Sequence, residues 1–125
     1  MIEILIMDDS SDKIESLKSE IFPIFQNGEI VVEVAHSLVA GRTKMQKKTY
    51  DLLILDMVMP EHDGEDANRT AGAEYLNEIY ENQSIKVPIQ IIGLTEYEEE
   101  FSQQQKDFKA FLLTYGNLFA KDVEI

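Results

Sequence analysis

The sequence predicts a doubly wound α/β domain, in which a five-stranded parallel sheet is covered by helices on both faces. Short apolar runs alternate with amphipathic stretches along the chain, and this alternation is typical of parallel sheets with crossover helices. The runs themselves are almost continuous in Ile, Leu and Val, as expected for strands buried on both faces. At 125 residues the chain fits a single domain over 1–125 with one hydrophobic core.

Three strands and two helices are expected in the first half of the chain. The strands should cover 2–7, 30–34 and 51–56. The first helix should begin near Asp12, which forms a capping-box pair with Glu15, and should end or kink at Pro23. Its inward-facing side chains are expected to be those of Ile14, Leu17, Ile21, Phe22 and Phe25. The second helix should follow Ser37, a suitable N-cap residue.

The second half should continue the alternation after a polar loop. The stretch from Glu61 to Ala71 precedes a helix whose inward-facing side chains are expected to be Leu76, Ile79 and Tyr80. The remaining elements should be a strand after Pro88, a helix over 97–106 and a strand over 110–114. Only nine residues follow Gly116, so a last helix is expected to be very short or truncated.

Small polar or acidic residues stand at the ends of three predicted strands. Asp8 and Asp9 follow the first strand. Asp56 ends the third strand, and Thr95 follows the fourth. Because the carboxyl ends of parallel strands meet at one edge of the sheet, these side chains should form one site. Carboxylates repel one another and burial disfavours their ionisation, so a cation, most simply a hard divalent metal ion with oxygen ligands, should hold them together.

The composition excludes several classes of function. The net charge is −13, with 24 acidic and 11 basic residues, so the domain should repel nucleic acids and anionic membrane surfaces. No apolar run approaches the roughly 20 residues of a membrane span. Cysteine is absent, which excludes disulfides and thiolate metal sites and makes the reducing cytoplasm the expected location.

The order of the strand-end residues resembles the receiver domain of two-component response regulators. Met59-Pro60 after Asp56, and Gly64 eight residues beyond Asp56, match the same family. The resemblance extends from Ile2 to about Thr114. It implies the strand order 2-1-3-4-5 and a signalling role without enzymatic activity of its own.

The resemblance also implies a role for each residue of the site. Asp56 would accept a phosphoryl group from a histidine kinase or a phosphotransfer protein, giving an acyl phosphate. Magnesium would be held by Asp8, Asp9, Asp56 and the backbone carbonyl of Val58. Thr95 would contact the phosphoryl group, and Phe111 would be the aromatic side chain that moves with it. The switched surface would act on a C-terminal effector domain or a protein target.

Two features depart from the family pattern. Receivers carry a lysine at the end of the fifth strand, where this chain has Thr114, so the acidic pocket is expected to lack a fixed cation. At least one of its carboxyl groups should then have a raised pKa when no metal is bound. Both Gly64 and Gly72 resemble the glycine that leads into the third helix, and the acidic loop between Glu61 and Ala71 should be mobile and solvated.

Other interpretations of the same residues remain open. The missing lysine favours a pseudo-receiver, a protein-binding module that is not regulated by phosphorylation. Thr95 also fits a helix N-cap, and Phe111 an ordinary core residue. A phosphatase of the haloacid-dehalogenase type is disfavoured, because Val58 stands where a second acid is required. The kinase, the regulated process, any effector domain beyond Ile125 and the oligomeric state are left open.

Overall fold

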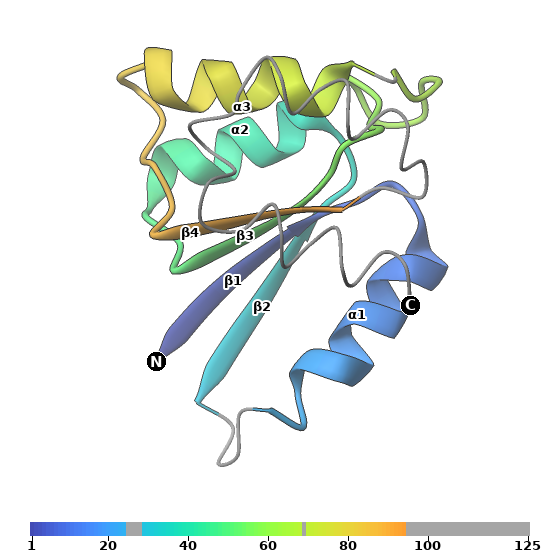
Figure 1. Ribbon diagram of the computed structural model, residues 1–125, viewed down its shortest axis with the longest axis vertical. Helices are drawn as coiled ribbons and strands as arrows, with labels where there is room; N and C mark the ends of the chain where they lie inside the picture. Colours follow the sequence, from blue (N-terminus) through green and yellow to red (C-terminus); the bar gives the residue numbers. More distant parts are fainter. Residues whose placement is uncertain (25–28, 69, 95–125) are drawn as a thin grey trace.

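The structure, a computed structural model, describes residues 1–24, 29–68 and 70–94 (Figure 1). Within these residues four parallel strands form one sheet in the order β2-β1-β3-β4. The strands are β1 (Ile2–Met7), β2 (Ile30–Ala35), β3 (Leu52–Asp56) and β4 (Gln90–Leu94). The predicted α/β class and the order of these four strands are confirmed, whereas the expected helix over 97–106 and fifth strand over 110–114 lie outside the described residues.

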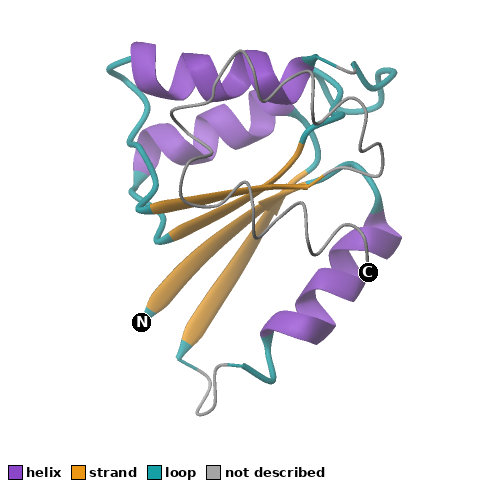
Figure 2. Ribbon diagram, in the orientation of Figure 1, coloured by secondary structure: helices purple, strands orange, loops and turns teal. Residues whose placement is uncertain are grey.

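Helices cover both faces of the sheet, as the doubly wound arrangement requires. Helix α1 (Ser11–Ile21) lies on one face, and α2 (Leu38–Lys47) and α3 (Ala71–Glu81) lie together on the other (Figures 1 and 2). Successive side chains of a strand point to opposite faces, and β1 supplies both cores in this way. Leu5 and Met7 pack in the core under α2 and α3, while Ile4 and Ile6 pack in the core under α1. None of the helices within the described ranges is long and apolar enough to cross a membrane.

The ends of α1 and α2 are set by their flanking residues. Ser37 is the N-cap of α2, as predicted, and its hydroxyl oxygen accepts a hydrogen bond from the backbone N–H of Ala40 at 3.1 Å. α1 begins at Ser11, near Asp12 as predicted, but the expected capping role of Asp12 is wrong, because Ser10 is the N-cap and accepts from the backbone N–H of Lys13 at 3.3 Å. α1 ends at Ile21, two residues before Pro23, so the prediction that the helix ends or kinks at this proline, which has no backbone N–H to donate, is confirmed.

Two of the side chains expected to face inward are exposed. Phe22 is 47% exposed, because it lies at the C-cap of α1, past the last helical turn. Tyr80 is 53% exposed, and Tyr75 takes the buried position in α3 instead, at 1% exposure. The buried stripe of α3 runs through Gly72, Tyr75, Leu76 and Ile79, which are spaced as one helical face, and Tyr80 lies beside that face.

The loop between β3 and α3 closes on itself before the helix begins. Met59 and Asn68 form an antiparallel bridge, with backbone N–H to O distances of 3.3 and 2.9 Å. Gly72 then donates its backbone N–H to the carbonyl oxygen of Met57 at 3.1 Å. A Cβ atom on Gly72 would lie 2.5 Å from the Cα of Met57, so the helix can approach the strand end only because this residue has no side chain. Gly72 is therefore the glycine that leads into α3, and Gly64, with φ +83°, forms a turn in the exposed part of the loop.

We predict that Gly72→Ala destabilises the fold by about 1–3 kcal/mol, because the added methyl meets backbone atoms that cannot move aside cheaply. Gly41→Ala in α2 is the matched control, since its Cβ would meet the end of the flexible Met7 side chain. Urea unfolding of both variants measures the difference. A Gly72→Ala variant as stable as Gly41→Ala would contradict the close approach of α3 to Met57.

Candidate functional site

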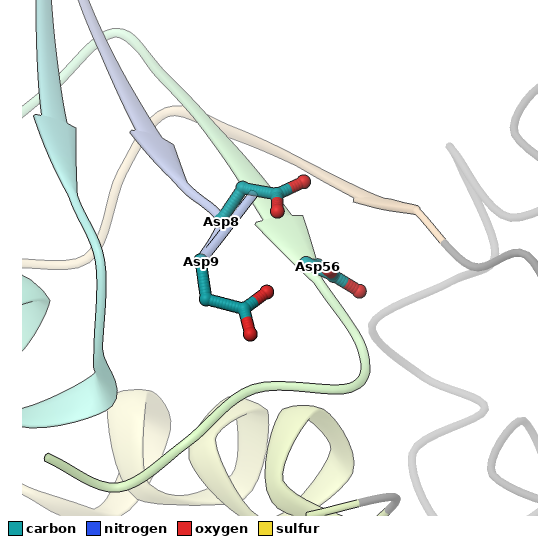
Figure 3. Close-up of side chains that lie close together, drawn as sticks. All are labelled: Asp8, Asp9 and Asp56. Carbon is teal, nitrogen blue, oxygen red and sulfur yellow. The ribbon is translucent and has the colours of Figure 1, made fainter. Parts of the chain in front are cut away.

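Three carboxylates gather at the carboxyl edge of the sheet. β1 and β3 pair with Met7 opposite Leu55, so the next residues on the two strands, Asp8 and Asp56, leave the sheet side by side. Figure 3 shows Asp8 and Asp9 at the end of β1 and Asp56 at the end of β3. One oxygen of each carboxylate lies within 4.8 Å of the others. The predicted acidic residues therefore do come together.

The two buried carboxylates are held in fixed orientations. Asp8 is 1% exposed and Asp56 is 3% exposed, whereas Asp9 is exposed to solvent. The backbone N–H of Ser10 donates to Asp8 Oδ1 at 2.8 Å, and that of Val58 donates to Asp56 Oδ1 at 3.0 Å. Each carboxylate thus accepts one hydrogen bond from the loop that follows its own strand, and its second oxygen faces the pocket.

The pocket contains a cation that the sequence interpretation missed. The ammonium of Lys13 donates a hydrogen bond to Asp56 Oδ2 at 2.9 Å and lies 3.5 Å from Asp8 Oδ2. The expectation of a pocket without a fixed cation is therefore wrong. A sequence signal did exist: Lys13 lies in the first turn of a helix, where the helix dipole disfavours a positive charge. A lysine at that place, four residues after Asp9, predicts an anionic partner near the helix N-terminus.

Burial raises the pKa of both inward-facing acids. The pKa of Asp8 rises from 3.8 to about 6, chiefly because burial disfavours the charged form, while the hydrogen bond from Ser10 opposes the rise. Burial also raises the pKa of Asp56, against the hydrogen bonds from Lys13 and Val58 that lower it. The predicted rise in pKa is thus confirmed, but its main cause is burial and not the absence of a cation.

The donor atoms of the pocket suit a hard divalent metal ion. Three carboxylates offer oxygen ligands only, which is the donor set that magnesium prefers. Asp8 Oδ2 is buried and accepts no hydrogen bond within the described residues, although a buried carboxylate oxygen normally accepts one, and the Lys13 ammonium lies 3.5 Å from it. The residues therefore fit Mg²⁺. The carbonyl of Val58 as a further ligand stays a prediction.

The β3–α3 loop borders this pocket and is tied to α2. The first two backbone N–H groups of α2, from Leu38 and Val39, donate to the carbonyl oxygens of Pro60 and Glu61, both at 3.0 Å. Arg42 of α2 pairs with Glu61 at 3.5 Å and with Glu78 of α3. Residues 61–68 are exposed, as expected for a solvated loop, and their predicted mobility stays a prediction.

Thr95, Phe111 and Thr114 lie outside the described residues. β4 reaches Leu94, which pairs with Asp56 in the sheet and accepts the backbone N–H of Met57 at 2.8 Å. Thr95 is the next residue along the chain. Its predicted contact with a phosphoryl group and the switch role of Phe111 stay predictions.

The comparisons with known proteins identify the family of the chain. The family model of the response regulator receiver domain matches residues 4–111. The chain belongs to this family. This match confirms the resemblance noted in the sequence. Receiver domains are signalling modules of two-component systems.

Solved structures of the family share the fold of this receiver domain. The response regulator TrrA from Thermotoga maritima, in complex with Mg²⁺-BeF, is 29% identical, with a TM-score of 0.61 over 86% of this chain and 81% of that chain. A two-component response regulator from Legionella pneumophila is 20% identical, with a TM-score of 0.66 over 99% and 95% of the two chains. A CheY-like receiver protein from Methanospirillum hungatei is 22% identical, with a TM-score of 0.58 over 86% and 74%.

A curated relative is much longer than this receiver domain. The uncharacterized protein y4jS of Sinorhizobium fredii is 30% identical over 110 residues. The match covers 86% of this chain and 26% of the relative. The receiver domain thus spans about a quarter of the length of the curated relative that it matches.

We predict that the metal-free domain loses stability as the pH rises towards 6. The pKa of Asp8 is about 6 in the folded state against 3.8 for an exposed aspartate, so between these values the folded state binds more protons than the unfolded state. The free energy of unfolding then falls with rising pH and levels off above about pH 6. Mg²⁺ at this pocket would bind the ionised carboxylates, so an increase in Tm caused by Mg²⁺ should grow across the same range.

Thermal melts from pH 4 to pH 8, with and without Mg²⁺, test this expectation. Asp8→Asn should reduce the fall in stability between pH 4 and pH 6, leaving the part that Asp56 contributes, while Asp63→Asn in the exposed loop should leave the pH dependence unchanged. An increase in Tm with Mg²⁺ that is equally large at pH 4 and pH 7 would show that the metal does not bind at Asp8.

Proposed function

We propose that this receiver domain is phosphorylated on Asp56 and acts as a switch for a protein-interaction surface, not as an enzyme. The observation that carries the proposal is the placement of Asp56. Its carboxylate is buried at the end of β3, oriented by Val58 and Lys13, and adjacent to two further acids that suit a divalent cation. The phosphodonor would be a histidine kinase or a phosphotransfer protein.

Phosphoryl transfer needs one nucleophile that is held in a fixed position relative to the phosphorus atom of the donor. An oxygen of Asp56 attacks the phosphorus of a phosphohistidine, a P–O bond forms and the P–N bond breaks. The electron pair of the broken bond stays with the imidazole nitrogen, which takes up a proton, and Asp56 carries an acyl phosphate. Catalysis of phosphoryl transfer is mainly positioning and charge neutralisation, and the hydrogen bond from Val58 supplies positioning at Oδ1.

The acidic pocket would hold Mg²⁺ through Asp8, Asp9, Asp56 and the Val58 carbonyl oxygen. When bound, the ion neutralises the negative charge of the phosphoryl oxygens. TrrA, 29% identical to this chain, was solved in complex with Mg²⁺-BeF, which supports magnesium binding here. The all-oxygen donor set supports it independently, as does Asp8 Oδ2, which accepts no hydrogen bond among the described residues.

We predict that a small phosphodonor with Mg²⁺ adds one phosphoryl group to the wild-type domain and none to Asp56→Asn. The amide of Asn has no negative oxygen to attack the phosphorus. Asp63→Asn, a change of the same type at an exposed loop position, should be modified as fast as the wild type. Intact-mass measurement at early times gives the result, and an unmodified wild type in excess donor would contradict phosphorylation at this site.

Thr95 and Phe111 would transmit the modification to the surface. β4 ends opposite Asp56, and Thr95 follows at once, which supports a contact between the Thr95 hydroxyl and the phosphoryl group. The contact would bias Phe111 and its neighbours between two populations. The switched surface would then engage an effector domain or a protein target.

We predict that a phosphoryl mimic bound at Asp56 shifts amide resonances throughout residues 95–113 in the wild type. Thr95→Ala should confine the shifts to the pocket, because the link to the phosphoryl group is lost. Thr43→Ala, on the exposed side of α2, is the control and should leave the wild-type pattern. Shifts that remain confined to the pocket in the wild type would mean that no switch is transmitted.

One observation favours the alternative of a pseudo-receiver that binds proteins without being phosphorylated. Thr114 stands where receivers carry the lysine of the fifth strand. The mass measurement above separates the two functions. In both, the net charge of −13 argues against direct nucleic-acid binding by this domain, and the lack of cysteine is compatible with the cytoplasm.

A further inference from the structure

We propose that Lys13 is the fixed cation of the phosphoacceptor site, pairing with Asp56 before transfer and with the phosphoryl oxygens after it. The inference rests on the proposed phosphorylation of Asp56. It assigns to α1 a charge that the family pattern places at the end of the fifth strand, where this chain has Thr114.

The contacts of Lys13 place it at the reacting carboxylate. Its Nζ lies 2.9 Å from Asp56 Oδ2 and 3.5 Å from Asp8 Oδ2, and so faces the pocket side of both buried acids. Among the basic residues that the structure describes, it is the one that forms ion pairs with these carboxylates. Figure 3 shows that the three acids come from two strand ends. The ammonium of Lys13 pairs with one carboxylate from each end, Asp8 and Asp56.

The position of Lys13 in its helix has a cost that the site offsets. The N-cap of α1 is Ser10, and Lys13 lies in the first turn, at the positive end of the helix dipole. A cation is disfavoured there by the helix itself. Two buried carboxylates provide the compensating interaction. The backbone N–H of Lys13 donates to Ser10 Oγ, and the backbone N–H of Ser10 donates to Asp8 and orients it.

The chemistry of an ammonium suits both states of Asp56. It has three N–H donors on a flexible stem, and the Lys13 side chain is 33% exposed, so it has room to follow an acceptor that moves. Transfer forms a P–O bond at Asp56, and the donor's leaving group departs with the electron pair of its broken bond. The attacking oxygen loses its negative charge and the phosphoryl oxygens bring new charge to the pocket. Lys13 keeps its protons and redirects its hydrogen bonds to those oxygens.

Lys13 also sets the charge that a metal ion meets. The three carboxylates and the ammonium carry a net charge of −2 when all are ionised, which one divalent cation neutralises. Removing Lys13 leaves a more negative pocket that attracts Mg²⁺ more strongly. The same change removes a donor to the phosphoryl oxygens. Removing Lys13 should therefore strengthen Mg²⁺ binding and weaken the stabilisation of the phosphoryl group.

The experiment compares Lys13→Gln and Lys13→Arg with Lys18→Gln. Lys18 lies on the same helix with a similarly exposed side chain, but pairs with Glu15 at 3.9 Å. Lys13→Gln should bind Mg²⁺ severalfold more tightly by titration calorimetry. Its phosphorylation by a small phosphodonor at saturating Mg²⁺ should be slower by on the order of tenfold or more. Lys13→Arg should recover much of the rate, and Lys18→Gln should match the wild type in both measurements.

A second measurement on the wild type needs no variant. Reductive methylation should modify the Lys13 amine more slowly than the Lys18 amine. The rate at Lys13 should fall further when Mg²⁺ and beryllofluoride are bound. Peptide mass spectrometry reads both sites in one sample. Equal methylation of the two lysines in all states would overturn the proposal even if Lys13→Gln does not fold.

The outcomes separate this inference from the function on which it rests. A wild type that binds Mg²⁺ but is never phosphorylated overturns the proposed function and the phosphoryl contact of Lys13. The Mg²⁺ affinity of Lys13→Gln still decides whether Lys13 is the cation of the pocket. A phosphorylated wild type with an unchanged rate and Mg²⁺ affinity in Lys13→Gln overturns the inference alone. Weaker Mg²⁺ binding together with slower transfer would indicate a purely structural role and also overturn it.

Discussion

The site depends on keeping two ionisable carboxyl groups buried side by side. Asp8 and Asp56 are almost inaccessible to solvent, and a buried carboxylate without a partner is strongly disfavoured. Two kinds of interaction make the arrangement tolerable, the hydrogen bonds from the backbone N–H groups of Ser10 and Val58 and the ammonium of Lys13. The raised pKa values of the two acids reflect the remaining cost of burying their charged forms. One oxygen of Asp8 is still without a donor among the described residues. The pocket is therefore prepared for additional positive charge.

The surrounding fold follows from the need to place these groups. The pairing of β1 with β3 puts the two acids at the same height on the sheet edge. Gly72 allows α3 to approach the backbone at Met57, which keeps the chain close to the strand end just after Asp56. Ser10 donates its backbone N–H to Asp8 and also caps α1 through its hydroxyl oxygen. The same residue therefore orients an acid of the site and fixes the start of the helix that carries Lys13.

The residues of the site were predictable from the sequence to the extent that they follow strand ends. Asp8, Asp9 and Asp56 come directly after buried apolar runs, and parallel pairing brings such ends together whatever the details of packing. Ser37 was recognisable because capping is local. Lys13 was not recognised, since its partner Asp56 is 43 residues away and only the strand register makes them neighbours. Tyr80 was expected to face inward but is exposed, because it lies beside the apolar stripe of α3 and packing decides which side chains at the edge of a stripe are buried.

A crystal structure of the domain with Mg²⁺ and beryllofluoride tests the central claim most directly, because it measures where each charge lies when the phosphoryl position is filled. We expect beryllofluoride on Asp56 and Mg²⁺ at the acidic pocket. We also expect the ammonium of Lys13 to lie within hydrogen-bonding distance of a fluorine atom. Beryllofluoride on Asp56 with Lys13 turned into solvent, or with a lysine from another element in its place, would contradict the account.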